Sequence, residues 1–306
     1  MPLTNFPQGV SSFGIPIIGS GPILTTGNVF FVNSAAINAS NGNEGTSPNK
    51  PFATIDYAVR KCTADNGDFI LVAPGHTETV ATNGGLRLDV AGVTVVGMGG
   101  GKVRPTINLT ATAAKVVVSA ARCSIVNMLF TGGIDAVAAV LSVGADDFSL
   151  LSCEYRDVTG QCTVFLITTG FDRLLVKDFV FIGDTAAGNG AAIAINGGSN
   201  HEIRNFRISG NFSVGGIDFR TTAATSVWIH DGLIKTYNSA DIAIIDTITA
   251  STGHIGPNLW LSLTDNAANI TEAITGATFR VFDSVYVVNA DNEKAMLINW
   301  TASTDA

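Results

Sequence analysis

Acidic and amide side chains recur along this chain at a spacing that could gather them on a repeating fold. Asp178, Asn205 and Asp231 follow one another at intervals of 27 and 26 residues. A Ca²⁺ site needs several oxygen ligands that converge on one point. If each interval is one coil of stacked strands, about 4.8 Å per coil places the two aspartates roughly 10 Å apart, with the asparagine between them. This spacing favours an exposed Asn/Asp ladder at a corner over a metal site.

Two neighbouring pairs of residues could serve acid–base chemistry. Asp146-Asp147 is the only tandem pair of carboxylates, and glycosidases use two carboxylates about 5 to 9.5 Å apart. The pair follows Gly144-Ala145 and begins a coil, which predicts a solvated turn. His230 and Asp231 are adjacent, and neighbours on a strand point to opposite faces. We therefore expect this second pair not to act together.

Other motifs with possible chemistry favour structural roles. His76 follows Pro74-Gly75 and is predicted to lie on the surface. The glycine-rich run Gly97–Gly101 does not open a helix, as a dinucleotide site requires, because Lys102-Val-Arg-Pro105 follows it. We expect a turn between coils there. The sequence has no G-x-S-x-G motif of the kind that holds a nucleophilic serine.

Three tryptophans and four cysteines complete the residues of chemical interest. Trp228, Trp260 and Trp300 could stack on sugars, but their spread over the last 80 or so residues favours packing or subunit contacts. No cysteines form a CxxC pair, and the histidines do not supply the spacing of a zinc site, so reduced, buried thiols are expected. We predict no catalytic, cofactor-binding or metal-binding residue. The cysteines are Cys62, Cys123, Cys153 and Cys162.

Composition excludes several classes of protein. Charged residues make up 14% of the 306-residue chain and hydrophobic residues 46%, which argues against intrinsic disorder. The net charge of −8 disfavours nucleic-acid binding, which depends on neutralising phosphates. No apolar stretch reaches the roughly 18 residues of a membrane span. Because the N-terminus lacks a basic region before an apolar core, we expect no signal peptide.

The first third of the chain predicts an arm, a strand and one helix. Residues 1–28 combine recurrent Gly and Pro with apolar residues, which predicts an extended arm that packs on its own body or on another subunit. Residues 28–33 read as a strand. Residues 54–63 show an apolar face at helical spacing, with Thr54 as N-cap. A buried strand is expected at 69–73.

From about residue 90, short apolar runs repeat at a nearly constant interval. The last residues of six aligned runs are separated by 26, 25, 27, 26 and 26 residues; these residues are Asn127, Cys153, Asp178, Asn205, Asp231 and Pro257. A second set of apolar runs lies between them, at 138–143, 164–167, 191–195, 217–219 and 242–245. Such a fixed period predicts a solenoid. A leucine-rich horseshoe would show an L-x-x-L-x-L run, and a β-sandwich would not explain the equal intervals.

The predicted fold is therefore an all-β right-handed parallel β-helix with coils of about 25–27 residues. We divide it into the arm 1–28, a segment 29–89 with the first strand, a capping helix and the first coil, and a body 90–306. The open ends of a β-helix need covers. The helix near 54–63 is placed to cover the first coil. At the far end, 281–288 and 296–300 are expected to be capped by a partner chain.

Two stretches carry a resemblance to known families. Residues 45–80, with Lys50-Pro-Phe-Ala-Thr-Ile55, Gly67-Asp68 and Pro74-Gly75, resemble the start of pectate-lyase-like right-handed β-helices, where a capping helix leads into the first coil. Residues 1–16 and 26–32 look like a tailed-phage virion structural protein. The first resemblance implies the fold and leaves activity open. The second implies assembly on a capsid or tail, often as a trimer.

These observations lead to one main functional prediction and two alternatives. The main prediction is a non-enzymatic virion protein, a capsid decoration (cement) protein on a phage head. It would form a homotrimer, bind the major capsid protein or another virion protein, and be made in the host cytoplasm. It would bind neither nucleic acid nor membrane. A tail or fibre component is a variant of this prediction. The alternatives are a polysaccharide lyase or hydrolase, such as a phage depolymerase, and a glycan-binding module.

Overall fold

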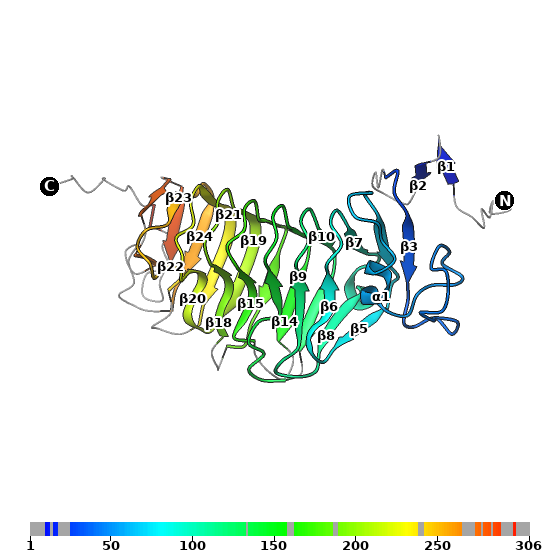
Figure 1. Cartoon of the computed structure of the whole chain (residues 1–306). Helices are drawn as coiled ribbons and strands as arrows, with labels where there is room; N and C mark the ends of the chain where they lie inside the picture. Colours follow the sequence, from blue (N-terminus) through cyan, green and yellow to red (C-terminus); the bar gives the residue numbers. More distant parts are fainter. Residues whose placement is uncertain are drawn as a thin grey trace, which may run out of the picture.

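Short strands rich in Val, Ile, Leu and Phe stack coil upon coil into a parallel β-solenoid of about eight turns (Figure 1). This confirms the predicted fold class. The computed structural model describes residues 10–12, 15–17, 25–132, 134–157, 162–185, 189–237, 242–264, 273–276, 278–282, 284–288 and 296–297. Within this part of the chain, no helix has the length and apolar character needed to cross a membrane.

One wall of the solenoid is an eight-stranded parallel sheet. Its strands pair in chain order, and every second residue points into the core, as in Leu141 and Val143 against Val116 and Val118. This sheet contains the predicted second set of apolar runs. Its strands are β6 (Asn83–Leu88), β9 (Lys115–Val118), β12 (Leu141–Val143), β15 (Val164–Thr168), β18 (Asn189–Ile195), β20 (Phe212–Phe219), β22 (Ile244–Asp246) and β25 (Ile274–Thr275).

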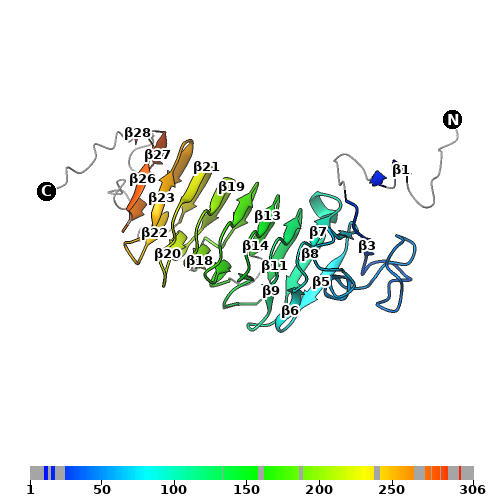
Figure 2. The same ribbon diagram turned by 45° about the horizontal axis from the view of Figure 1, so that its top comes forward.

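The other wall is a larger sheet whose parallel strands form two rows on either side of a bend (Figure 2). Row 1 contains β3 (Val29–Val32), β4 (Phe69–Val72), β7 (Thr94–Gly97), β10 (Ser124–Val126), β13 (Ser149–Leu151), β16 (Leu175–Lys177), the first halves of β19 (Glu202–Gly210) and β21 (Val227–Thr236), β23 (Thr252–Ile255) and β26 (Thr278–Val281). Row 2 contains β5 (Thr77–Val80), β8 (Thr106–Leu109), β11 (Leu129–Gly132), β14 (Glu154–Asp157), β17 (Val180–Ile182), the second halves of β19 and β21, β24 (Leu259–Ser262) and β27 (Val285–Val288).

A residue in the left-handed region makes the bend between the two rows in successive coils. Asn and Asp tolerate this conformation better than most residues. The bend residues are Asn127, Ser152, Asp178, Asn205, Asp231 and Asn258, with φ of 54°, 53°, 55°, 49°, 51° and 54°. The predicted alignment was right for four of them. It was wrong by one residue at Cys153, whose side chain is buried in the core, and at Pro257.

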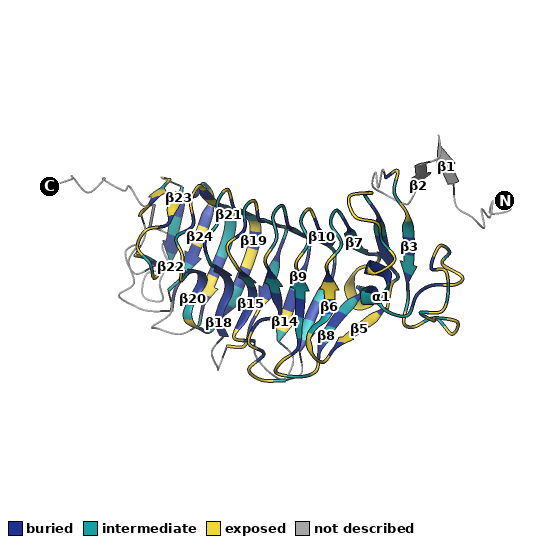
Figure 3. Cartoon of the chain, viewed as in Figure 1, coloured by how far each residue is buried: buried dark blue, intermediate teal, exposed yellow. Residues whose placement is uncertain are grey.

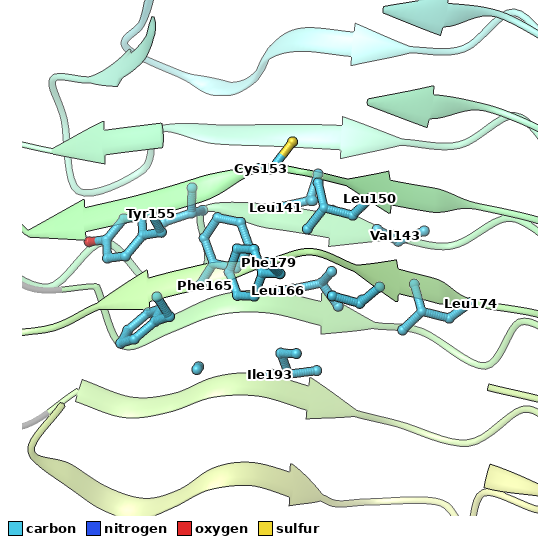
Figure 4. Close-up of a cluster of buried hydrophobic side chains, with 14 of the residues drawn as sticks. Leu141, Val143, Leu150, Cys153, Tyr155, Phe165, Leu166, Leu174, Phe179 and Ile193 are labelled. Carbon is cyan, nitrogen blue, oxygen red and sulfur yellow. The ribbon is translucent and has the colours of Figure 1, made fainter. Parts of the chain in front are cut away.

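Apolar ladders fill the space between the walls. Buried positions alternate with partly exposed ones along strands such as β9 and β11 (Figure 3). Aromatic rings occupy the middle coils, where Phe165 stacks on Phe179 at 4.9 Å and meets Tyr155 at 5.3 Å between ring centroids (Figure 4). Ile203, Ile229 and Ile255 form one of the inward ladders across β19, β21 and β23. The sequence period of the coils therefore follows from the need to place one inward apolar residue of this ladder in every coil.

A short helix covers the N-terminal end of the stack. Helix α1 (Ile55–Val59) is shorter than the predicted 54–63, and Thr54 is its N-cap, as predicted: the Thr54 hydroxyl accepts a hydrogen bond from the Tyr57 N–H. The apolar side of α1 is fully buried. The glycine run near residue 100 forms a turn and the 3₁₀ helix η1 (Gly101–Val103), as expected.

The two ends of the chain are described only in part. In the arm, β1 (Val10–Ser12) and β2 (Ile15–Ile17) pair antiparallel, and residues 1–9, 13–14 and 18–24 lie outside the described residues. At the far end, β28 (Met296–Leu297) pairs antiparallel with β27. The predictions that the arm packs on a neighbour and that a partner caps the far end stay predictions.

Candidate functional site

One outward line of residues on row 1 combines an acid, an aromatic ring, an imidazole and a guanidinium. Glu202 on β19 pairs in register with Trp228 on β21, Trp228 with His254 on β23, and His254 with Arg280 on β26. Successive strands in such a stack lie about 4.8 Å apart. The four side chains therefore follow one another along the solenoid, one per coil.

Trp228 is the centre of this line, and it is held in place while remaining exposed. Its side of β21 faces outward, and 43% of the residue is exposed. The indole N–H donates a hydrogen bond of 2.8 Å to the Gly256 carbonyl oxygen. The indole ring also stacks on the His230 ring, with centroids 4.1 Å apart. A rigid, exposed aromatic face is a surface on which another flat apolar face can stack.

The expectation that His230 and Asp231 point to opposite faces was wrong. His230 Nδ1 lies 2.6 Å from Asp231 Oδ2. Strand alternation fails here because Asp231 is the bend residue, and its φ of 51° turns its side chain to the side of its neighbour. In a regular strand these two side chains would lie on opposite faces and would not meet.

The second ring nitrogen of His230 faces another carboxylate. His230 Nε2 lies 3.3 Å from Glu202 Oε1, and the same oxygen forms an ion pair of 3.1 Å with Arg204 Nε. The His230 side chain is only 8% exposed, whereas that of Glu202 is 35% exposed. An imidazole can donate hydrogen bonds from both nitrogens only when it is protonated. The His230 ring thus bridges the two carboxylates through its two nitrogens.

The bend holds Asp231 in its charged form. Asn258, the bend residue of the next coil, donates a hydrogen bond of 2.9 Å from Nδ2 to Asp231 Oδ1. This bond, followed by that from His230, lowers the pKa of Asp231 below its ordinary value. Glu202, His230 and Asp231 form what we call the carboxylate–imidazole group. Beside an exposed tryptophan, it offers hydrogen bonds to hydroxyl groups and a pair of carboxylates for acid–base chemistry.

The predicted Asn/Asp ladder exists along the bend. Asn205 Nδ2 donates to Asp178 Oδ1, in the same way as Asn258 donates to Asp231. Asp178, Asn205 and Asp231 all lie at the bend, as their spacing predicted, and Asp231 also belongs to the carboxylate–imidazole group.

Asp146 and Asp147 lie at a turn, as predicted. Asp147 has a φ of 60°, and Arg173 pairs with both aspartates. The hydrogen bond from Arg173 lowers the pKa of Asp147. The pair is a charged corner between coils.

His76 is buried, so the prediction of a surface position was wrong. The Ser34 N–H donates to His76 Nδ1 at 2.9 Å, and Nε2 faces Glu78 Oε2 at 3.1 Å. Glu78 Oε2 also accepts a hydrogen bond of 2.9 Å from the Ile55 N–H. The pair joins the loop after β3, β5 and the start of α1 through partners 23 and 42 residues away. Its role is to connect the helix to the first coil.

Both described tryptophans stack on a neighbouring ring, as the packing prediction expected, although each is partly exposed; the prediction of subunit contacts stays a prediction. Trp260 is 44% exposed, on row 2, and stacks on Tyr286 at 4.4 Å; Trp300 lies outside the described residues. The four cysteines are unpaired, and three are buried.

Sequence reasoning missed Glu202, Arg204, His254 and Arg280, although a signal was present. Residues 202, 228, 254 and 280 are each separated by 26 residues, which is the coil period itself. The coil period therefore predicts that these polar and aromatic residues lie in line along the solenoid, as it does for the apolar ones.

Neither the family models nor the curated proteins contain a match to this sequence. Among solved structures, the fold is similar to the crystal structure of a GH136 lacto-N-biosidase from Eubacterium ramulus. The identity is 11%, the TM-score is 0.41, and the match covers 87% of this chain and 67% of the other. This likeness concerns the β-helix fold, and nothing in it shows a phage origin. The similar structure is that of a glycoside hydrolase, which is contrary to the prediction that this chain is not an enzyme.

Proposed function

We propose that this chain is a carbohydrate-active β-helix that binds a glycan on the outer face of row 1. The observation that supports the proposal is the exposed Trp228 ring beside the carboxylate–imidazole group. The apolar face of a pyranose stacks on the indole. The carboxylates, together with Arg204, bind the hydroxyl groups around the sugar ring. A glycan-binding module, one of the alternatives that the sequence allows, requires exposed aromatic residues on one coil face.

Hydrolysis of a glycosidic bond is the reaction that the two carboxylates favour. Glycosidases place two carboxyl groups on either side of the scissile bond. Asp231, kept ionised by Asn258 and His230, accepts a proton from the attacking water. Glu202 donates a proton to the glycosidic oxygen, which leaves with the departing sugar. His230 contacts both carboxylates and positions them, and both are exposed enough for exchange with solvent to restore their protons after each turnover.

Two tryptophan variants test glycan binding. Trp228→Ala removes the proposed stacking surface. Trp260→Ala is the matched control, because Trp260 is equally exposed but lies on row 2. On a glycan array, we expect Trp228→Ala to weaken binding roughly 30-fold, the effect of losing a contact worth about 2 kcal/mol. Trp260→Ala should bind like the wild type. Equal binding by wild type and Trp228→Ala would refute the proposed surface.

Hydrolysis is tested on the glycan that the array identifies. Glu202→Gln and Asp231→Asn keep the size of each side chain and remove its charge. Each should reduce release of reducing ends at least about 100-fold while binding stays within a few-fold of wild type. Unchanged hydrolysis in both variants would contradict the catalytic assignment and leave the binding proposal to stand on the tryptophan result.

The predicted place on a phage particle stays a prediction. It includes a homotrimer, contact with a major capsid protein, location on the virion surface, and no binding to nucleic acid or membrane. A tail component that acts on polysaccharide would reconcile that prediction with the proposed function. Light scattering of the purified chain, with and without residues 1–28, tests whether the arm holds a trimer together.

A further inference from the structure

The line of row 1 residues has a positive end two coils beyond Trp228. Arg280 on β26 is exposed and pairs in register with His254 on β23, which is also exposed and pairs with Trp228. We propose that the glycan bound at Trp228 carries an anionic group, a carboxylate or a sulfate ester, and that Arg280 binds this group. The inference rests on the proposed function and names its substrate class.

Arg280 differs from most arginines of this chain in having no carboxylate beside it among the described residues. Those that form ion pairs are Arg60, Arg104, Arg122, Arg156, Arg173, Arg204 and Arg220. A guanidinium that forms no ion pair within the described part of the chain has donors to offer to a ligand. Its planar fork matches the geometry of a carboxylate or a sulfate, which it can bind with two parallel hydrogen bonds.

The surface between Trp228 and Arg280 suits a sugar chain. His254 fills the intervening coil, and its ring lies against the exposed ring of Phe282 at 5.7 Å. Two coils of about 4.8 Å separate Trp228 from Arg280 along the solenoid. A sugar stacked on the indole, with its substituent or its neighbouring sugar, can bridge that distance over a flat surface of rings.

The charges along the line give the bound glycan a direction. Asp231, which the bend holds in its charged form, lies on β21 with Trp228 and would repel an anion, whereas Arg280 lies two coils away on β26. In a chain with a net charge of −8, this local positive end decides where an anion can settle. The anionic group therefore lies toward β26, and the bond to be cleaved lies toward the carboxylate–imidazole group.

A glycan array with three matched sets tests the inference: neutral oligosaccharides, the same backbones with uronate carboxylates, and the same backbones with sulfate esters. We expect wild-type protein to prefer one of the anionic sets over the neutral set by roughly tenfold. Arg280→Gln should abolish that preference while leaving affinity for the neutral set unchanged. Which anionic set is preferred identifies the group.

Arg207→Gln is the matched control, because Arg207 is also exposed and without a carboxylate partner among the described residues, but lies on row 2. It should keep the preference for anionic glycans. Equal binding of neutral and anionic sets by the wild type, or an unchanged preference in Arg280→Gln, would overturn the inference. Loss of binding to every set in Trp228→Ala, with the preference unaffected by Arg280→Gln, would refute this inference and support the proposed function.

Discussion

Asp68 is a buried carboxylate on which the N-terminal end of the solenoid depends. Its Oδ1 accepts hydrogen bonds from the Asn28 N–H at 2.6 Å and from Asn66 Nδ2 at 2.7 Å. Its Oδ2 accepts one from the Thr63 N–H at 2.6 Å. These bonds connect the segment before β3 and the loop after α1 to the start of β4. We predict that Asp68→Asn removes the acceptor on one side of this group and so weakens the connection between these segments.

The size of the effect follows from the donors that lose their acceptor. The amide that replaces the carboxylate keeps one oxygen, so the donors on the other side meet an NH₂ group instead. A hydrogen bond to a charged group contributes about 1.5 to 3 kcal/mol, and an unsatisfied buried donor costs about as much. We expect a loss of about 3 kcal/mol in local stability, which is roughly a 100-fold change in the opening equilibrium.

Hydrogen exchange measured amide by amide is the suitable assay, because repeat proteins open locally and not only as a whole. After correction for intrinsic rates, the amides of Thr63 and Phe69 should exchange roughly 100-fold faster in Asp68→Asn. Asp65→Asn is the control, since Asp65 forms an exposed ion pair with Arg122 and such pairs contribute less than about 1 kcal/mol. A change below about threefold in Asp68→Asn, or an equal change in Asp65→Asn, would refute the reasoning.

The same carboxylate predicts a pH dependence. Burial acts to raise the pKa of Asp68, but the donors from Thr63, Asn28 and Asn66 outweigh it and lower the pKa below its ordinary value. The unfolded value is about 3.9. Asp68 therefore contributes fully to folding stability above the unfolded pKa. This contribution is lost as the pH falls through the lower pKa of the folded state. In the wild type, the Phe69 amide should be less protected against hydrogen exchange in acid than at neutral pH. In Asp68→Asn, this pH dependence of protection should be missing.

Three further predictions concern the core, the thiols and the bend. Phe165→Ala, in the aromatic cluster of Figure 4, should cost about 3 to 5 kcal/mol in urea unfolding; a loss below about 1 kcal/mol would contradict close packing there. Burial raises the pKa of the Cys153 thiol to about 12, so at about pH 8 iodoacetamide should label it only after denaturation, as peptide mass spectrometry would show; rapid labelling of the folded chain would count against this. Gly232→Ala would drive a Cβ into the ring of Phe206 and should lower stability by about 1 to 3 kcal/mol, with thermal unfolding as the measurement and an unchanged Tm as the opposing result.

The coils could be predicted from sequence because each level must bury the same kind of residue at the same place. Two errors of register have clear physical causes. At Cys153, the sequence offers two adjacent apolar residues, Leu150 and Leu151, either of which could be the inward one. In the structure Leu150 points inward and pairs with Ile125, so the bend falls at Ser152 and not at Cys153. At the last aligned coil, Gly256 and Pro257 add a residue before the bend at Asn258.

The candidate site was harder to predict because it depends on the bend and on contacts between coils. The His230–Asp231 pair exists only because the bend cancels strand alternation. The Glu202–His230 contact joins residues 28 positions apart and requires the register of β19 against β21. His76 was predicted to lie on the surface because the turn at Pro74-Gly75 gives no sign of the contacts with Ser34 and Glu78 that bury it.

The bend also gives the chain a place where its length can change. From β21 to β23, Ile229 pairs with Ile255, 26 residues on, whereas from β21 to β24 Leu233 pairs with Trp260, 27 residues on. The extra residue is absorbed between the rows, and the apolar ladders on both sides stay intact. Within a strand, one inserted residue would exchange the inner and outer faces. Insertions and deletions in descendants of this gene should therefore collect at the bend, next to the carboxylate–imidazole group, where they reshape the surface without disturbing the core.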